Sequence, residues 1–382
     1  MKQVKQILEG SRAISQTIKN INPAVVSAYP ITPQTHIVED LAKLKANGQA
    51  NYEYVRAESE FAAASIVLGA SATGVRTYSA TSSQGLLLMT EVIFNIAGMR
   101  LPVVMTCANR SISAPINIWN DHSDVMTVRD AGWIQLFAAT AQEMVDTHIL
   151  AYKLAEKLHL PVMVNVDGFI LTHAYEAVLV PTSKKIKKYL PTYKPKGDAY
   201  LNPKRPFTFG AFFTPADYLE TRKSLQTDLM TSLAVIKKEY QLFKKTFGRK
   251  NTANGLVEYC GTKKPQTVLI ALGSMAGTIQ ETLKKYPQVG LLKIKVYRPF
   301  PIEDIMAAIK KVKNIAVIEK AVSLGGTGPL YADLKTGFPK NSLMPNIRNY
   351  IVGLGGRDVT AKMIGEIIRD SGKTQQKIKF IG

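Results

Sequence analysis

Short segments that are apolar at nearly every position alternate with helix-length segments through the first half of this chain. They cover residues 24–29 (AVVSAY), 101–108 (LPVVMTCA) and 160–166 (LPVMVNV). A strand with one face in water alternates apolar and polar residues, whereas a strand buried on both faces is apolar throughout. Buried strands that alternate with helices predict an α/β fold with a doubly wound parallel sheet.

Composition divides the chain into three predicted parts. Residues 1–180 form the parallel-sheet domain, residues 181–260 a basic linker and helical connection, and residues 261–382 a smaller α/β domain. The net charge of +20 is uneven, because residues 1–180 carry −2, residues 181–250 carry +11 and the remainder carries +11. No nucleic-acid-binding motif accompanies this charge, so we expect it to face solvent or acidic neighbours rather than nucleic acid.

Two absences limit the function classes. No run of about 18 apolar residues occurs, and the first 21 residues lack the apolar core of a signal peptide, so we expect a cytoplasmic location without membrane contact. The two cysteines, Cys107 and Cys260, lie far apart and outside any Cys-x-x-Cys pair. We therefore expect no iron–sulfur cluster or zinc site built by this chain alone.

Local patterns predict further elements. Residues 3–20 are amphipathic and predict one helix, with a possible break at Gly10 and Ser11, and residues 85–97 predict a second apolar helix. The segment after Arg110 has few regular periods and predicts a long loop at the rim of a pocket. The rim residues expected there are Trp119, Asn120, Asp121, His122 and Trp133.

Glu60 is the first candidate site residue. It begins a segment of small and apolar residues (61–68) that predicts a helix. In an apolar cleft, loss of hydration favours the protonated form of a carboxyl group and suits it to share a proton with a ligand nitrogen. The alternative is an acid in the first helical turn, stabilised there by the helix dipole.

Arg110 is the second candidate, because it follows directly after an apolar strand. A planar guanidinium group binds a substrate carboxylate through two parallel hydrogen bonds, which fix both its position and its orientation. The alternative is a structural ion pair with Asp121 or Asp124.

Thr32 lies between Pro30 and Pro33, which restrict the backbone at the end of a predicted strand. Its hydroxyl could donate to a substrate oxygen or cap the helix that begins near Gln34. His122 could act as a base, although a single histidine on a polar loop is more often a surface or structural residue.

Three glycine clusters are candidates for nucleotide loops, at residues 273–277, 325–328 and 353–356. The second follows a predicted strand and precedes a predicted helix, but none has the full dinucleotide fingerprint or a P-loop lysine. Tight turns at an interface are the favoured interpretation.

Taken together, four motifs resemble the α subunits of 2-oxoacid:ferredoxin oxidoreductases, most closely those of the pyruvate:ferredoxin enzymes. They are YPITP at residues 29–33, the Glu60 segment, ATSSQGL at residues 80–86, and Arg110. The resemblance extends over nearly the whole chain through INIWNDHSDV, RDAGWIQ, PVMVNVDGF and GGTGPL.

This resemblance implies a pyrimidine-type thiamine diphosphate domain followed by a smaller domain like the C-terminal domain of transketolases. It implies that Glu60 bonds the aminopyrimidine ring nitrogen and that Pro30 also contacts the cofactor. Thr32 and Arg110 would bind the 2-oxoacid, and Glu60, Arg110 and Thr32 would be the catalytic residues. No metal ligand is implied.

The resemblance also implies a shared site. Thiamine enzymes usually hold the diphosphate and Mg²⁺ through a Gly-Asp-Gly motif, which this chain lacks. We therefore expect a β subunit to hold the diphosphate, the Mg²⁺ and the nearest 4Fe-4S cluster, with ferredoxin-like γ and δ subunits carrying electrons to ferredoxin. The implied reaction converts pyruvate and CoA to acetyl-CoA and CO₂, reversibly. The alternatives are a branched-chain 2-oxoacid (2-oxoisovalerate) enzyme of the same family and a non-catalytic basic scaffold subunit.

Overall fold

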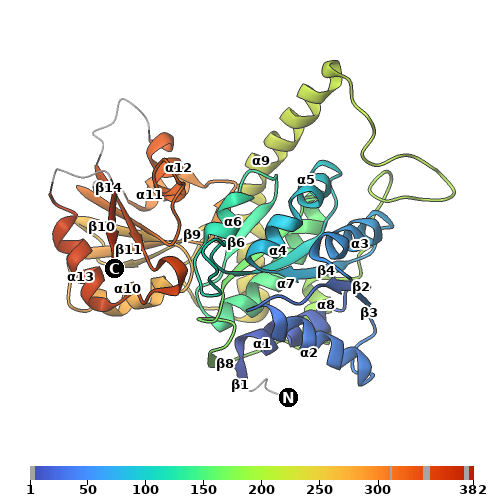
Figure 1. The fold of residues 1–382 in the computed structure, drawn as a ribbon, viewed down its shortest axis with the longest axis horizontal. Helices are drawn as coiled ribbons and strands as arrows, with labels where there is room; N and C mark the ends of the chain where they lie inside the picture. The colour runs from blue at the N-terminus through green and yellow to red at the C-terminus, as the bar shows by residue number, and fades with distance from the viewer. Residues whose placement is uncertain (1–4, 310–311, 339–344, 374–377) are drawn as a thin grey trace.

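Two large β-sheets with flanking helices and one two-stranded sheet make up the fold in a computed structural model that describes residues 5–309, 312–338, 345–373 and 378–382 (Figure 1). The larger sheet has seven strands in the order β12-β6-β7-β5-β4-β2-β3. All its neighbouring pairs are parallel except β12 and β6, as predicted for a doubly wound sheet. Its strands are β2 (Val25–Ala28), β3 (Glu53–Arg56), β4 (Thr77–Thr81), β5 (Val104–Asn109), β6 (Ile134–Phe137), β7 (Val162–Asp167) and β12 (Val296–Arg298).

Helices cover this sheet in two groups. One group contains α1, α2 and α7, which pack together, and the other contains α3, α4, α5 and α6. Right-handed crossovers place the two groups on opposite faces, because the strand order reverses between β3 and β4. The helices are α1 (Gly10–Ile21), α2 (Thr35–Ala46), α3 (Glu60–Ala72), α4 (Ser83–Leu88), α5 (Thr90–Gly98), α6 (Ser123–Thr127) and α7 (Ala141–Leu158).

The smaller sheet has six strands in the order β15-β14-β13-β10-β11-β9, with only β9 antiparallel to its neighbour. Its strands are β9 (Val257–Gly261), β10 (Thr267–Ala271), β11 (Val289–Ile294), β13 (Asn314–Glu319), β14 (Asn346–Val352) and β15 (Ile378–Ile381). Its helices are α10 (Met275–Leu283), α11 (Ile302–Ala308), α12 (Pro329–Gly337), the 3₁₀ turn η1 (Leu354–Gly356) and α13 (Ala361–Asp370).

The connection between the two sheets contains α8 (Ser183–Tyr189), an extended segment and the long helix α9 (Pro215–Phe247), whose first half projects from the body (Figure 1). β9 falls inside the predicted connection, and β12 comes from the predicted second domain yet extends the first sheet. The boundaries at residues 180 and 260 stay a prediction. Within the described ranges, no helix is both long and apolar enough to cross a bilayer.

The predicted helix over residues 3–20 is wrong in its first part. Residues 6–9 form β1 (Gln6–Glu9), which pairs antiparallel with β8 (Tyr175–Val178), and the helix begins at Gly10. The Gly10 backbone N–H donates to the Ala174 carbonyl at 3.0 Å, so this glycine lies where the chain turns against a distant segment. Pairing with a strand that far along the chain leaves no local signature in the sequence.

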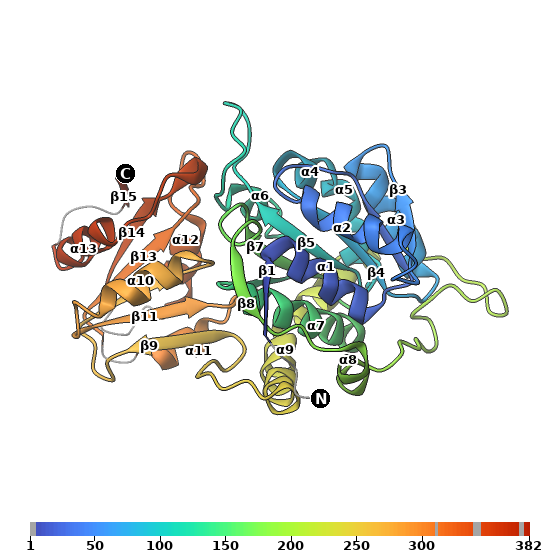
Figure 2. The ribbon, with the colours of Figure 1, turned by 90° about the horizontal axis from the view of Figure 1, so that it is seen from below.

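Two other predictions are corrected. The predicted helix over residues 85–97 is divided at Met89 into α4 and α5. The predicted loop after Arg110 contains α6 and β6, and Trp133 lies directly before β6 at 1% exposure. What remains irregular is the segment between β5 and α6, which Figure 2 shows projecting beside the second domain.

A cluster of charged side chains connects α7 of the first domain with β9 and β11 of the smaller sheet. Glu143, in the first turn of α7, lies 2.7 Å from Lys293 of β11 and 3.0 Å from Lys295. Lys293 also lies 2.5 Å from Glu258 of β9. Burial alone would raise the pKa of Glu143, but the two ammonium groups outweigh it and lower that pKa to about 2.

We predict that Glu143→Gln lowers stability at neutral pH by about 2–3 kcal/mol, because it leaves two lysines without a shared acceptor. The native pKa lies below the unfolded value of 4.5, so this contribution is present above pH 4.5 and is lost as the pH falls toward 2. Urea denaturation midpoints of wild type and variant should therefore differ at pH 7 and converge in acid. Glu281→Gln, in an exposed pair with Lys284, is the control and should change stability by less than about 1 kcal/mol. A midpoint difference that does not depend on pH would contradict the assignment.

Candidate active site

The polar segments that follow β2, β4 and β5 meet at the carboxyl edge of the larger sheet. Ligands of open α/β sheets bind at this edge. Arg110, which follows β5, donates from Nη1 to the Thr32 carbonyl at 2.9 Å, and from Nη2 to Oε1 of Gln84 at 3.4 Å. Thr32 follows β2 and Gln84 follows β4, so a single guanidinium group connects the ends of three strands.

The Arg110 side chain has neutral acceptors only. Besides Thr32 and Gln84, it contacts the Asn117 carbonyl, with Nε at 3.1 Å from that oxygen. No carboxylate forms an ion pair with it among the described residues, and it is only 9% exposed. Burial lowers the pKa of Arg110, and the nearby charge of Asp124 opposes this. The predicted alternative of a side-chain ion pair with Asp121 or Asp124 is therefore wrong.

The Asp124 carboxylate instead accepts hydrogen bonds from backbone N–H groups. Its Oδ2 accepts the N–H of Arg110 at 2.9 Å and of Ser83 at 3.0 Å, and its Oδ1 accepts from Nδ2 of Asn109 at 3.1 Å. Ser83 has a positive φ of 46°, which is unfavourable for serine, and these bonds hold it there. Burial raises the pKa of Asp124 to about 6, although the bonds from Arg110 and Ser83 oppose the rise.

Glu60 begins α3, after Ser59 caps the helix by accepting the Ala62 N–H at 3.1 Å. The Glu60 side chain is 7% exposed, yet its carboxylate has no hydrogen bond or ion pair within the described part of the chain. The predicted dipole effect at the helix start is compatible with this position, but it leaves both carboxylate oxygens without a direct partner. Neither oxygen is fully enclosed by protein, so a ligand can reach the carboxylate.

Gly85 and Thr81 lie close to the Glu60 carboxylate. A Cβ atom added at Gly85 of α4 would lie 2.7 Å from Glu60 Oε1, so this glycine lets the helix approach the carboxylate. The same Cβ would also meet Oγ1 of Thr81, which is buried and has no hydrogen-bond partner among the described residues. An unpartnered carboxylate beside an unpartnered hydroxyl fits a ligand nitrogen that can bind the carboxylate.

Thr32 and Pro30 are both exposed, beyond the end of β2. Thr32 does not cap α2, because the cap position is Gln34 and no side chain caps it. The Gln34 side chain anchors the segment instead, since its Nε2 donates to the Ala80 carbonyl at 2.5 Å and its Oε1 accepts the Ile31 N–H at 3.3 Å. The structure thus brings Thr32 to Arg110 through its backbone and leaves the Thr32 hydroxyl on the surface.

His122 is not a free base. It is fully buried, and its Nε2 lies 2.7 Å from Oδ1 of Asp167 at the end of β7. Asp167 also accepts from the Ser274 N–H at 3.0 Å and lies 3.4 Å from Nζ of Lys320, both in the second domain. Burial would raise the pKa of Asp167, but Lys320 and His122 keep it well below its usual range. His122 is therefore a structural residue of the domain junction.

The glycine clusters form turns. Gly353, Gly355 and Gly356 have positive φ, and Gly355 contacts the loop after β5 by donating to Oδ2 of Asp121 at 3.1 Å. At residues 325–328, the start of α12 is occupied by the buried Glu319, which accepts the N–H groups of Leu330 at 2.8 Å and Tyr331 at 3.2 Å. An internal carboxylate already fills the place of a phosphate, so this turn is not a nucleotide loop.

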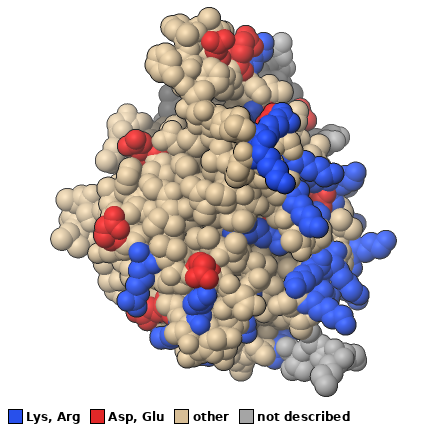
Figure 3. Space-filling view, turned by 90° about the vertical axis from the view of Figure 1, so that its right-hand side faces the viewer, with Lys and Arg blue, Asp and Glu red and all other residues tan. Residues whose placement is uncertain are grey.

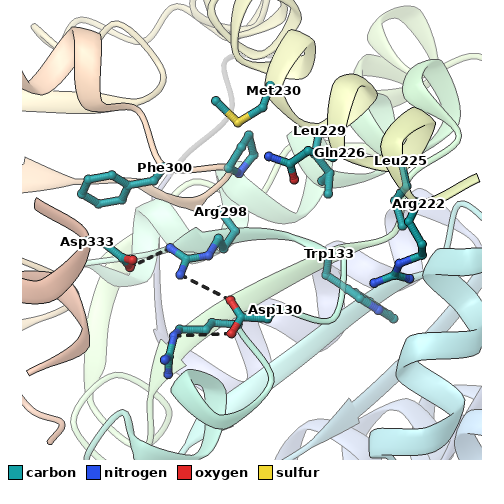
Figure 4. A pocket seen from close by; sticks show the side chains of 13 residues that line it. Asp130, Trp133, Arg222, Leu225, Gln226, Leu229, Met230, Arg298, Phe300 and Asp333 are labelled. Carbon is teal, nitrogen blue, oxygen red and sulfur yellow. Dashed lines mark hydrogen bonds and ion pairs between the residues drawn. The ribbon is translucent and has the colours of Figure 1, made fainter. Parts of the chain in front are cut away.

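A cavity of about 300 Å³ lies elsewhere, between α9, the turn before β6 and the second domain (Figure 4). Arg298 lines it and is compensated by Asp333 at 2.9 Å and Asp130 at 3.6 Å. Trp133, which was predicted at a pocket rim, lines this cavity, whereas Glu60, Arg110, Thr32 and Pro30 do not.

Three residues at the carboxyl edge were missed as positioning residues. They are Gln34, Gln84 and Asp124. Gln34 was interpreted only as a helix start, and Asp124 only as an ion-pair partner. Gln34 contacts Ala80 across 46 positions, and no local pattern marks such a contact.

Two protein families match this chain. Residues 16–241 match the family described as pyruvate flavodoxin/ferredoxin oxidoreductase, thiamine diphosphate-binding. Residues 266–364 match the family described as pyruvate:ferredoxin oxidoreductase core domain II.

Curated relatives match over nearly their full length. The chain is 46% identical to pyruvate synthase subunit PorA of Methanocaldococcus jannaschii, covering 97% of this chain and 95% of that protein. It is 41% identical to the PorA subunit of Pyrococcus abyssi, covering 99% and 98%. Identity to the ketoisovalerate oxidoreductase subunit VorA of the same organism is 37%, with the same coverage.

Among solved structures, the chain resembles a 2-oxoglutarate:ferredoxin oxidoreductase from Magnetococcus marinus, with a TM-score of 0.77 and 20% identity over 97% of this chain and 66% of that one. It also resembles a split-gene transketolase, with a TM-score of 0.56 and 12% identity over 97% and 99%. These two structures confirm the predicted fold class. The family matches and the close relatives confirm the resemblance found in the sequence: the chain belongs to the pyruvate flavodoxin/ferredoxin oxidoreductase family, whose matched domain binds thiamine diphosphate.

Proposed function

We propose that this chain is the α subunit of a pyruvate synthase, which converts pyruvate and CoA to acetyl-CoA and CO₂, reversibly, and passes electrons to ferredoxin. The observation that carries the proposal is the buried, unpartnered carboxylate of Glu60 beside Gly85, at the edge where Arg110 lies. The identity to PorA subunits, at 46% and 41%, exceeds the 37% to a VorA subunit and supports pyruvate over 2-oxoisovalerate.

Glu60 would hold the cofactor by accepting a hydrogen bond from its aminopyrimidine ring nitrogen, and Pro30 would contact it from the segment after β2. Thiamine diphosphate, when bound, supplies the electron sink for decarboxylation of a 2-oxoacid. The chain contributes a carboxylate free to hold or release a proton at that nitrogen, because no protein group among the described residues competes for it.

Arg110 would bind the substrate carboxylate, with Thr32 beside it. Its three carbonyl and amide acceptors are neutral, so they orient the guanidinium group without compensating its charge. An anionic substrate would supply the missing negative charge and displace water from the group. The exposed Thr32 hydroxyl would donate to a substrate oxygen.

The remaining components would come from partner subunits. We assign the diphosphate, Mg²⁺ and the nearest 4Fe-4S cluster to a β subunit, and further clusters to γ and δ subunits. Exposed apolar side chains on the segments around the carboxyl edge support a protein partner there: Tyr29, Phe61, Leu88, Ile116 and Trp119. On the face shown in Figure 3, lysine and arginine gather toward one side and a broad area has few charges, which suits a protein contact better than a nucleic acid. The cytoplasmic location stays a prediction.

We predict that Glu60→Gln lowers kcat of the assembled complex by at least about 100-fold, because the amide cannot exchange a proton with the ring nitrogen. The denaturation midpoint should not fall, since the carboxylate has no protein partner to lose. Glu58→Gln, two positions earlier and exposed, is the matched control and should keep full activity. Retention of wild-type kcat by Glu60→Gln would remove Glu60 from the site.

We predict that Arg110→Ala lowers kcat/KM for pyruvate by at least about 30-fold, the equivalent of about 2 kcal/mol for a charge-assisted pair. Arg110→Lys should lose part of this, because lysine keeps the charge but not the planar fork. Arg205→Ala, in an exposed pair with Asp198, is the control. A non-catalytic scaffold subunit predicts the opposite result, namely unchanged turnover of the complex with Arg110→Ala.

We predict that the assembled complex has a higher kcat/KM for pyruvate than for 2-oxoisovalerate, and that the chain alone decarboxylates neither. Parallel assays of the copurified complex and the lone chain, with thiamine diphosphate and Mg²⁺ added, test both statements. A preference for 2-oxoisovalerate would favour the branched-chain alternative, and decarboxylation by the lone chain would contradict the shared site.

A further inference from the structure

Two histidines and a glutamate from three separate segments meet where β1 leads into α1. Glu9 ends β1, His36 lies in the first turn of α2, and His173 lies between β7 and β8. One potential ligand atom from each lies within 4.8 Å of the others. None of these residues belongs to the carboxyl-edge site described above.

The side chains are already oriented toward one another. Nδ1 of His36 lies 2.6 Å from Oε1 of Glu9, and the two imidazole rings lie 4.6 Å apart between centroids. Nδ1 of His173 lies 2.8 Å from the hydroxyl of Thr172, which in turn accepts the Phe169 N–H at 2.8 Å. This hydroxyl fixes the ring of His173 and leaves its other nitrogen, Nε2, without a partner in the described ranges.

We propose that Glu9, His36 and His173 bind one divalent transition-metal ion of the Zn²⁺ class. Two neutral imidazoles and one carboxylate are a ligand set that Zn²⁺, Co²⁺ and Ni²⁺ favour over Mg²⁺ or Ca²⁺. Ligand atoms around a tetrahedral Zn²⁺ lie about 3.3 Å apart. The present ligand atoms lie at most 4.8 Å apart, so side-chain rotations that move them by about 1.5 Å would bring them to this distance. His36 is half exposed and free to make them.

A hollow of about 250 Å³ gives an ion access to the cluster. Glu9 and His36 line it together with two more carboxylates, Glu39 and Asp40. Arg12 and Lys43 also line it and partly offset these acids. Solvent in the hollow would supply the fourth ligand, because three protein ligands leave one position open.

The ion would connect three parts of the chain. Glu9 is the residue before α1, and His36 follows the 29–34 segment of the proposed active site. His173 contacts Phe169, with ring centroids 4.8 Å apart, and Phe169 contacts Trp119 of the loop after β5 at 4.6 Å. Bound metal would therefore stabilise the β1–β8 ribbon and the segment that supports this loop.

Titration of the metal-free full chain with Co²⁺ tests the proposal, because tetrahedral Co²⁺ has a visible absorption spectrum. We expect one Co²⁺ per chain, displaced by Zn²⁺, and a rise in the denaturation midpoint with Zn²⁺. His36→Gln, His173→Gln and Glu9→Gln should each weaken binding at least about 100-fold, and Thr172→Val about 10-fold through loss of ring orientation.

His159→Asn is the matched control, because it removes a histidine outside the cluster at a left-handed position that asparagine tolerates. It should bind Co²⁺ as the wild type does. Denaturation midpoints measured without metal identify any variant that is misfolded. If a histidine variant is misfolded, the Co²⁺ affinity of Glu9→Gln tests the proposal independently. The proposal is overturned if the His36→Gln/His173→Gln double variant binds Co²⁺ as tightly as wild type, or if wild type requires about 1 mM metal or more, the range of adventitious surface binding.

Discussion

The carboxyl edge of the larger sheet depends on the carboxylate of Asp124. Parallel strands end side by side, but nothing in the sheet itself fixes the direction in which the chain leaves each strand. Asp124 fixes two of these exits by accepting the backbone N–H groups of Ser83 and Arg110. Because both donors are backbone atoms, the bonds set the path of the chain, and the side chains of Gln84 and Arg110 follow from it.

A second buried carboxylate couples this edge to the other domain. Asp167 ends β7, next to β5, and contacts His122, Lys320 and Ser274. His122 is two residues before Asp124, so the helix that holds the strand exits is itself held by the domain junction. A buried charge that loses one partner is costly, which opposes sliding of the two domains against each other. The second domain thus positions the proposed site without contributing a candidate residue to it.

The parts that the sequence predicts are those with local causes. β5 and β7 are apolar at most positions because both faces are covered, and their ends deliver Arg110 and Asp167 where the pattern indicates. β1, β6 and β12 depend on pairing with distant strands, so their short segments carry no distinguishing period. Within the site, Glu60 and Arg110 were identifiable by charge at element ends. The roles of Gln34 and Asp124 could not be identified from the sequence. Both side chains bond to backbone atoms, and these atoms do not depend on which residue type the partner is.

Neither Glu60 nor Arg110 forms an ion pair with any residue that the structure describes. A chain selected for stability alone would gain by bringing a buried carboxylate and a buried guanidinium group together, since each is only slightly exposed. Arg110 is instead held toward Thr32 and Asn117 by two carbonyl oxygens, and Gly85 lets α4 pack closely against Glu60. These neutral acceptors bind a guanidinium group more weakly than a carboxylate does, so they orient the arginine without compensating its positive charge. Because the Glu60 and Arg110 side chains are already fixed in place, they lose little conformational entropy when a ligand binds. A ligand that bonds both groups therefore gains interactions that the folded chain alone does not make.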